Sequence, residues 1–324
     1  MTYVTETDFP AWLRDAAGLL GHGVLPLRGE RLRLWGLSEV WRLELAGMGP
    51  RSVVVKRGTG EMAEEAARYR DLVAPLRVPA PRLIAARGGG GTEPVVLVLE
   101  DAGQHTLEQR PTAGGYREAV RTLARMRAVA ARELASLPAL GAGSRRTTAD
   151  FADTARVTGA ALARLRPDLA GALDGPARVL AGRLELLAAD PGAHPATLVH
   201  SDFHAKNLVL GTGGRVVPVD WPLAYVHAHL GDLYCLLREA RNHGRAQQVE
   251  VASLPGVFAE EAGADPASVR EQLVIGGLCW TLLALRWVVE DGVRVVPESA
   301  RWIDELVSDA RSLAGTPGSV GAMG

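Results

Sequence analysis

The amino-acid sequence predicts an α+β protein with two lobes: a small N-terminal antiparallel sheet lobe with one helix, and a larger, mostly helical C-terminal lobe. Apolar residues in the first hundred positions alternate or bunch as they do in strands, and turns containing Gly and Pro separate them. After residue 100 the chain changes to long segments rich in Ala, Leu and Arg, in which apolar residues recur at helical spacing. The length of 324 residues suits two such units, because a domain holds about 100–200 residues.

The N-terminal lobe is expected to occupy residues 1–100. Its helix is predicted from a run of good helix formers, which Pro75 ends, and its last two strands are separated by the glycines at 88–91. The predicted elements are a strand at 32–34, a hairpin of strands at 40–45 and 52–56 about a turn at 47–50, a helix at 61–73, and strands at 82–85 and 95–99.

The C-terminal lobe is expected over residues 101–314, and the tail 315–324 is expected to be disordered because it has almost nothing to bury. Apolar periodicity predicts helices on both sides of a region of short strands. These elements are helices at 114–135, 150–165 and 174–189, strands at 197–200, 208–210 and 215–220, and helices near 228–242, 268–290 and 298–313.

Composition argues against nucleic acid and membranes as partners. The formal net charge is only -1, whereas a protein that grips a nucleic-acid backbone needs a basic surplus. The acidic, polar N-terminus does not resemble a signal peptide. The most apolar segment, Leu278 to Val289, contains Arg286 and is shorter than the ~20 residues of a membrane span, so it predicts a core helix. We therefore expect a cytoplasmic protein.

Lysine is nearly absent from the chain. Of the 36 basic side chains, 34 are Arg and only Lys56 and Lys206 are Lys. This skew is typical of a GC-rich coding bias that writes Arg wherever either cation suffices. A site that needs a compact point charge on a flexible stem would keep its lysine. The two lysines therefore mark candidate sites, with chance survival as the alternative.

The segment from Leu198 to Trp221 carries the strongest functional pattern. Transfer of a phosphoryl group to a hydroxyl needs a carboxylate that takes the proton, and oxygen ligands that hold Mg²⁺. Asp202, Asn207 and Asp220 supply such groups. The alternative is a polar loop between two strands.

This pattern resembles the protein-kinase-like fold and, within it, the superfamily of aminoglycoside phosphotransferases and choline kinases. His200, Asp202 and Asn207 match its His-x-Asp-x-x-x-x-Asn motif, and Asp220 with Trp221 matches its later Asp-Trp pair. The resemblance covers roughly residues 30–310. It implies a bilobal kinase-like fold, with Asp202 as the catalytic base and Asn207 and Asp220 as ligands of Mg²⁺.

The resemblance gives roles to three neighbouring residues. Lys206, four residues after Asp202, would neutralise charge on the transferring phosphoryl group. His200 is counted with the catalytic set because it would brace the loop. Asp232 would accept backbone amides of that loop from below.

Lys56 ends an apolar strand and is followed within one helix by several glutamates. In kinase-like enzymes a lysine at this place reaches the nucleotide phosphates, and a helix carboxylate orients it. The family spacing from a Glu to a later Leu and a Val-Pro-x-Pro stretch selects Glu65, with Glu64 as the alternative. The other interpretation is that these glutamates form an acidic face of the helix that is exposed to solvent. The resemblance implies that the nucleotide would be ATP or GTP.

Two further nucleotide contacts are expected. The loop at 35–41 has one glycine, so Ser38 or the amides beside it would contact the phosphates, with a core hairpin turn as an equal alternative. The segment after the last strand of the sheet resembles the hinge between lobes, where backbone groups of Glu100, Asp101 or Ala102 would bind the base. Departures from the family are Arg127 in place of a histidine and Ser201 in place of a glycine.

The acceptor is expected among the helices after residue 220. Residues 151–324 hold 20 acidic and 15 basic residues, which is mild for a binder of polycations. Six His and Arg residues between 227 and 245 favour a neutral or partly anionic acceptor, such as a nucleoside or sugar-containing antibiotic inactivated by phosphorylation, although an ordinary solvated surface is equally compatible with them.

Three other functions remain open. An aminoglycoside kinase would need a more acidic cleft. A choline or ethanolamine kinase would need an aromatic cage, but the available aromatics are expected in the core. A non-catalytic nucleotide-binding scaffold is less favoured because the catalytic Asp and Asn are both present. The candidate cage residues are Trp221, Tyr225, Tyr234, Trp280, Trp287 and Trp302.

Overall fold

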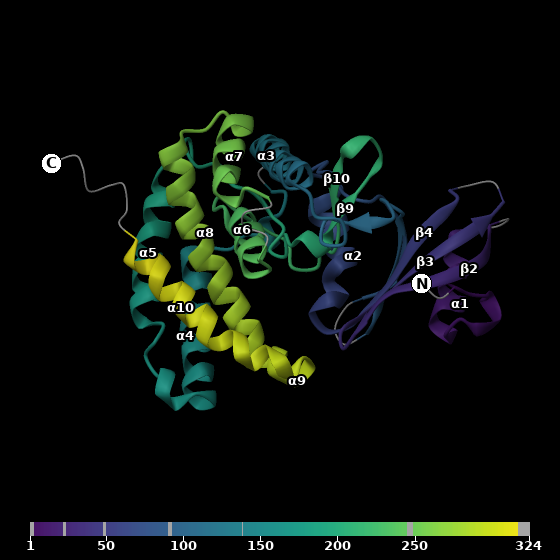
Figure 1. The fold of residues 1–324 in the computed structure, drawn as a ribbon, viewed down its shortest axis with the longest axis horizontal. Helices are drawn as coiled ribbons and strands as arrows, with labels where there is room; N and C mark the ends of the chain where they lie inside the picture. Colours follow the sequence, from purple (N-terminus) through teal and green to yellow (C-terminus); the bar gives the residue numbers. More distant parts are fainter. Residues whose placement is uncertain are drawn as a thin grey trace.

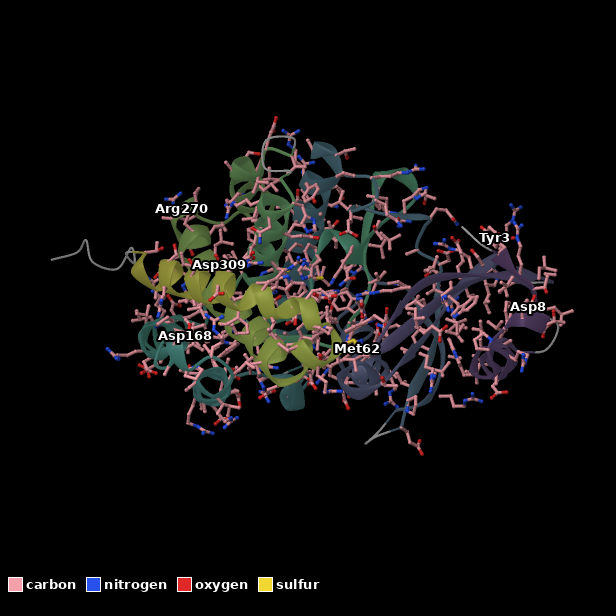
Figure 2. The ribbon with its side chains drawn as sticks, turned by 60° about the horizontal axis from the view of Figure 1, so that its bottom comes forward. Tyr3, Asp8, Met62, Asp168, Arg270 and Asp309 are labelled. Carbon is pink, nitrogen blue, oxygen red and sulfur yellow. The ribbon has the colours of Figure 1, made fainter. Side chains whose placement is uncertain are left out.

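The computed structural model describes residues 3–21, 24–47, 50–89, 93–137, 139–244 and 249–316. A sheet occupies one end of the molecule and a group of helices the other, with the segment containing α2 and the β9–β10 hairpin between them (Figure 1). The predicted α+β fold with an N-terminal antiparallel sheet and a mostly helical C-terminal lobe is confirmed. Tyr3 and Asp8 lie at the far end of the sheet lobe, whereas Met62 lies near the junction of the lobes (Figure 2).

The N-terminal sheet has the strand order β1-β2-β3-β4-β6-β5 and is antiparallel throughout. Opposite residues in such a sheet point to the same face. The register therefore sets Lys56 of β4 opposite Val40 of β3, on the face that meets the second lobe. The strands are β1 Tyr3–Val4, β2 Leu25–Trp35, β3 Ser38–Ala46, β4 Ser52–Gly58, β5 Leu83–Gly88 and β6 Val95–Glu100.

The two faces of this sheet carry different helices. On the outer face, α1 (Ala11–Ala17) buries Leu13 against Trp41 and Leu43. The sequence analysis expected one helix in this lobe and missed α1, because its seven residues bury only two side chains. The predicted helix at 61–73 is present as one continuous helical segment. It consists of a 3₁₀ turn at Gly60–Glu64, α2 at Glu65–Arg68 and a π turn at Tyr69–Val73.

The C-terminal lobe contains the predicted helices and the short strands between them. The sequence analysis missed α7, the three-residue helix α9 and the short strands β7 and β11. The helices are α3 Ala113–Ser136, α4 Thr148–Leu165, α5 Asp174–Ala189, α6 Gly231–Asn242, α7 Leu254–Ala262, α8 Pro266–Trp287, α9 Val293–Val295 and α10 Trp302–Gly315. The strands are β7 His105–Thr106, β8 Thr197–Val199, β9 Leu208–Leu210, β10 Val216–Pro218 and β11 Tyr225–His227.

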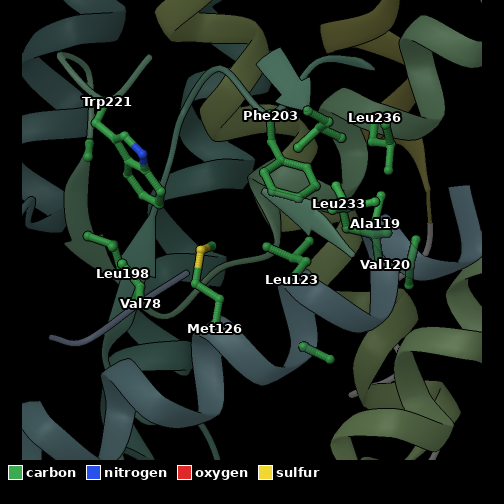
Figure 3. Close-up of a cluster of buried hydrophobic side chains, with 14 of the residues drawn as sticks. Val78, Ala119, Val120, Leu123, Met126, Leu198, Phe203, Trp221, Leu233 and Leu236 are labelled. Carbon is green, nitrogen blue, oxygen red and sulfur yellow. The ribbon is translucent and has the colours of Figure 1, made fainter. Parts of the chain in front are cut away.

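The largest hydrophobic core runs from the sheet lobe into the C-terminal lobe. Leu123 and Met126 of α3 lie in it with Phe203 and Trp221 (Figure 3), and all four side chains are fully buried. Phe203 lies between Asp202 and Asn207 in the sequence. The core therefore anchors the segment that carries the predicted catalytic residues.

Among the described residues, one helical stretch, Pro266–Val295, is long and apolar enough to span a membrane. Half of its most apolar window is buried inside the protein, and α8 packs against α6 and α10. These contacts are typical of the core helix of a soluble protein, as the sequence analysis expected. Helix α10 ends at Gly315, and most of the tail expected to be disordered, residues 317–324, lies outside the described residues.

Candidate active site

The loop that follows β8 is shaped by one buried carboxylate. Asp232, at the start of α6, accepts hydrogen bonds from the backbone N–H groups of His200 and Ser201, both at 2.8 Å. These bonds hold Ser201 in the left-handed region, with φ of +73°. Glycine adopts that region without a steric cost, which explains why the family usually has glycine here. The predicted role of Asp232 agrees with this geometry.

His200 is fully buried beneath the loop. Its Nε2 lies 3.1 Å from the carbonyl oxygen of Val219, and its Nδ1 accepts the backbone N–H of Asp202 at 3.3 Å. These partners require the proton on Nε2. Burial lowers the pKa of His200, which keeps the ring neutral. His200 therefore braces the loop from beneath and does not line the cleft, so the geometry agrees with the predicted bracing role and makes His200 a positioning residue.

Asp202 presents its carboxylate to the cleft with both oxygens partnered. Asn207 Nδ2 donates to Oδ2 at 2.7 Å, and His204 Nε2 lies 2.9 Å from Oδ1. Lys206 Nζ is 4.0 Å from Oδ2. Burial alone would raise the pKa of Asp202, but Lys206 and His204 outweigh it and hold the pKa well below its usual range. The sequence analysis missed His204, although it lies within the motif segment.

The β9–β10 hairpin places the two predicted metal ligands beside each other. Asn207 directly precedes β9 and Asp220 follows β10 by two residues, and Leu208 pairs with Pro218 across the hairpin. The backbone N–H of Val219 donates to the carbonyl of Asn207 at 2.9 Å. Because Asn207 Nδ2 donates to Asp202, its amide oxygen is the atom left to act as a ligand.

Lys56 joins the two lobes. Its Nζ lies 2.6 Å from Glu65 Oε2 and 2.5 Å from Asp220 Oδ1. Glu65 Oε1 also accepts the backbone N–H of Trp221 at 3.0 Å. Glu64 is exposed, so the geometry pairs Lys56 with Glu65. Strand β4, helix α2 and the segment after β10 thus meet at one ammonium group.

The ammonium group of Lys56 lies between two carboxylates at this junction, and Arg33 also reaches one of them, Asp220. Burial raises the pKa of Glu65 and, together with the smaller effect of the charge on Asp220, outweighs the opposing effect of Lys56. Asp220 is held below its usual pKa because Lys56 and Arg33 outweigh its burial. Asp220 therefore stays ionised, and Glu65 is the first of the pair to take a proton.

The remaining predicted nucleotide contacts lie apart from this cluster. Ser38 is buried, and its Oγ accepts the indole N–H of Trp35 at 2.8 Å inside the β2–β3 hairpin. Glu100 is exposed at the end of β6, and its Oε2 accepts the backbone N–H of Arg82 at 3.3 Å. Ala102 lies in the linker between the lobes. The next residue, Gly103, has φ of +153°, and a Cβ there would come within 2.5 Å of the carbonyl oxygen of Leu210.

Arg127, which replaces the family's histidine, is buried under the same region. It donates to the carbonyl oxygens of His229 and Ala228 at 2.8 and 2.5 Å. These residues lead into α6 and Asp232, so Arg127 supports the backbone that holds the loop. Burial lowers the pKa of Arg127 to about 10, which leaves it charged at neutral pH.

Asp202, Lys206 and Asp220 open into a cleft of about 780 Å³ between the lobes. One wall is a face of α8, continued by the first residue of the π turn that follows it at Val288–Gly292, and its members recur at helical spacing. These residues are Trp280, Leu283, Ala284, Trp287 and Val288. Trp302 of α10 and Trp35 of the sheet lobe also line the cleft.

The prediction that the large aromatics belong to the core is therefore only partly right. Trp221 and Tyr225 are buried in the core, but three tryptophans of α8 and α10 face the cleft: Trp280, Trp287 and Trp302. Helical spacing alone cannot separate the two cases, because a face that lines a cleft has the same period as one that packs in the core.

Of the six His and Arg residues expected on the acceptor side, Arg238 and His243 line the cleft and His227, His229 and Arg241 do not, while Arg245 lies outside the described residues. His229 is buried, and both His227 and His229 contact the ring of Phe151. Arg238 lines the cleft but donates to Asp309 at 2.6 Å. The acidic residues of the cleft outnumber its Arg and Lys residues: they are Glu61, Glu108, Asp202, Asp220, Glu239 and Glu305, against Arg33, Lys206, Arg238 and Arg301. The charge pattern therefore gives no support to an anionic acceptor.

The whole arrangement combines a carboxylate that faces the cleft, Asp202, with the neighbouring oxygen-bearing side chains of Asn207 and Asp220 and a buried strand lysine, Lys56. The model of the phosphotransferase enzyme family matches residues 31–271. The chain belongs to this family. The predicted resemblance and the enzyme class, a phosphotransferase acting on a small molecule, are thereby confirmed.

Solved structures similar to the chain are aminoglycoside phosphotransferases. A thermostable mutant of APH(4)-Ia, with ADP and hygromycin B, is 15% identical with a TM-score of 0.59, covering 97% of this chain and 98% of that one. APH(3'')-Id from Streptomyces rimosus, with ADP and streptomycin, is 21% identical with a TM-score of 0.52, covering 83% and 96%. Spectinomycin phosphotransferase APH(9)-Ia is 13% identical with a TM-score of 0.51, covering 93% and 98%. These similarities establish the fold. No curated protein sequence matches the chain.

Proposed function

We propose that the protein transfers the γ-phosphoryl group of ATP or GTP to a hydroxyl of a small-molecule antibiotic and so inactivates it in the cytoplasm. The observation that carries this proposal is that Asp202 and Asp220 line one cleft and that the buried Lys56 pairs with Asp220. Nucleotide binding is also supported by the similar solved structures, which contain ADP or AMP-PNP.

The donor set fits Mg²⁺. Asp220 offers an ionised carboxylate and Asn207 an amide oxygen, and hard oxygen ligands are what Mg²⁺ prefers. When bound, the metal ion would neutralise negative charge on the nucleotide phosphates. Asn207 and Asp220 would hold it, and Lys56 would bind phosphate oxygens from the side of the sheet.

Asp202 is positioned to act on the acceptor. The acceptor oxygen forms a bond to the γ-phosphorus while the bond to the bridging oxygen breaks, and the nucleoside diphosphate leaves. The hydroxyl proton passes to the carboxylate of Asp202, which its neighbours keep ionised. Lys206 offsets the charge of the transferring group. His200 and Asp232 act by holding the loop in place.

The walls of the cleft support an acceptor with a planar or apolar face. Trp280 and Trp287 lie one heptad apart on α8 and give stacking surface within the same cleft as Asp202. A nucleoside or another sugar-containing antibiotic presents both a hydroxyl and such a face. Adding a phosphate would defeat binding of the antibiotic wherever that hydroxyl must be buried.

An aminoglycoside is the second candidate acceptor, and one observation favours it. Glu108, Glu239 and His243 line the cleft, and one ligand atom from each lies within 4.8 Å of the others. Carboxylates at this spacing attract ammonium groups. The similar structures also bind aminoglycosides, namely hygromycin B, streptomycin and spectinomycin.

Both candidates are tested by one acceptor panel. The purified chain is incubated with Mg²⁺ and ATP, then GTP, against nucleoside antibiotics, hygromycin B, streptomycin, choline and ethanolamine, and products are read by mass spectrometry. Expression in a susceptible host should raise resistance to the class that is phosphorylated, and Asp202→Asn should not. Turnover of choline or ethanolamine alone would refute the antibiotic role, and no turnover with any acceptor would favour a nucleotide-binding scaffold.

A further inference from the structure

Arg33 is a cation of the sheet that lies outside every motif of the sequence. In the sheet register Arg33 is opposite Val40, and Val40 is opposite Lys56. Arg33 and Lys56 therefore share one face of the sheet. Both reach the same carboxylate, because Arg33 Nη1 lies 3.3 Å from Asp220 Oδ2 and Lys56 Nζ lies 2.5 Å from Asp220 Oδ1.

Arg33 and Lys56 differ in side-chain exposure and in the number of carboxylates that they contact. The Lys56 side chain is 5% exposed and lies between two carboxylates, whereas the Arg33 side chain is 36% exposed and lines the cleft. The guanidinium carbon of Arg33 is 5.4 Å from the centre of the Trp35 ring, beside the turn of the β2–β3 hairpin. The bond to Asp220 uses one of its five N–H donors. Arg33 can therefore bind a further anion without leaving its place.

We propose that Arg33 binds the phosphate groups of the nucleotide together with Lys56. This inference rests on the proposed phosphotransferase function. Lys56 and Arg33 balance the charges of Glu65 and Asp220, so a divalent metal ion held by Asp220 would give this junction a positive excess. Phosphate oxygens supply the missing negative charge. The planar fork of a guanidinium matches two oxygens of a phosphate, which a lysine cannot do.

The test is calorimetric titration of the full-length chain with ATP, and separately with adenosine, in EDTA and then with Mg²⁺. Arg33→Gln should weaken ATP binding about tenfold to hundredfold, as expected for the loss of charge-assisted hydrogen bonds. Binding of adenosine, which has no phosphate, should not change. Because neither titration uses an acceptor or turnover, the result does not depend on catalysis.

Arg31→Gln is the matched control. Arg31 lies on the same strand but opposite Trp41, on the outer face, with Nη1 4.0 Å from Glu39. The Arg31→Gln variant should bind ATP with the affinity of the wild-type chain. Wild-type ATP affinity in Arg33→Gln overturns the proposal, and so does an equal loss of affinity for ATP and adenosine.

If Arg33→Gln fails to fold, the same titrations with ATP and adenosine are made with Arg33→Lys. Weaker ATP binding with unchanged adenosine binding supports the proposal, whereas wild-type ATP binding by this variant overturns it. Failure of the proposed function gives a different result, because the wild-type chain itself would then bind no nucleotide or phosphorylate no acceptor.

Discussion

Replacing Lys56 by Met tests the junction between the lobes most severely. The substitution keeps the apolar stem but removes the positive charge that lies 2.6 Å from Glu65 Oε2, and it leaves Asp220 Oδ1 without its 2.5 Å partner. Glu65 is fully buried, so water cannot replace the ammonium group. Removing one partner of a buried ion pair costs about 3–5 kcal/mol, and we expect a loss of free energy of unfolding in that range.

Two comparisons separate the lost charge from other causes. Lys56→Met combined with Glu65→Gln should recover about 1–2 kcal/mol, because the double variant has one buried carboxylate fewer and the two sites are coupled. Arg57→Met, the next residue on the strand, should change stability by no more than about 0.5 kcal/mol. Urea denaturation followed by circular dichroism measures all three variants.

The structure also predicts how the loss of stability caused by Lys56→Met changes with pH. The pKa of Glu65 is raised in the folded protein, and without Lys56 it should rise further. Glu65 of the variant then takes up its proton at a higher pH in the folded than in the unfolded state, which relieves the cost of burial as the pH falls. The penalty of Lys56→Met should therefore be smaller at pH 5 than at pH 8. A penalty below about 1 kcal/mol at pH 8, or one that grows on acidification, refutes the reasoning.

Three other predictions concern the loop, the histidines and the cleft wall. Ser201→Gly should stabilise the fold by about 0.5–1 kcal/mol because it removes a left-handed serine with φ of +73°, and a lower urea midpoint would contradict this. Burial lowers the pKa of His227 to about 4 from an ordinary 6.5, so the unfolded state binds a proton at a higher pH than the folded state does. The free energy of unfolding should therefore fall by about 2 kcal/mol between pH 7 and pH 5. His227→Gln should make the free energy of unfolding less dependent on pH, and an unchanged dependence would show that other groups cause it. Trp287→Ala should raise KM for the acceptor at least tenfold with little change in KM for ATP, whereas the equally aromatic Trp12 of α1, replaced by Ala, should leave the acceptor KM unchanged.

The sequence predicted the residues whose chemistry depends on local spacing. Asp202, Asn207 and His200 lie within one short loop, so the motif fixes their types and order together. Lys56 and Glu65 were found because a strand and the helix after it are joined by few residues. Lysine is also rare in this chain, so the presence of Lys56 and Lys206 among its many arginines identified both as candidate site residues.

The sequence could not predict contacts that depend on how the lobes meet. Arg33 and Asp220 are 187 positions apart, and no local pattern relates them. The tryptophan wall of α8 has the spacing of a core face, so only the packing of the neighbouring helices reveals that it lines a cleft. His227 and His229 were assigned to the acceptor side from their charge, yet both rings contact Phe151 away from the cleft.

The most direct test of the central claim is a single-turnover reaction in which nucleotide binding and phosphoryl transfer are measured on the same sample. Wild-type chain, in excess over labelled ATP and with Mg²⁺ and a panel acceptor, should convert one acceptor hydroxyl to its phosphate ester as the diphosphate appears. Asp202→Asn should bind ATP with unchanged affinity and form no ester, because in the proposed mechanism the lost carboxylate takes the acceptor proton and does not bind ATP. Retention of more than a few per cent of the wild-type rate by Asp202→Asn would contradict the account.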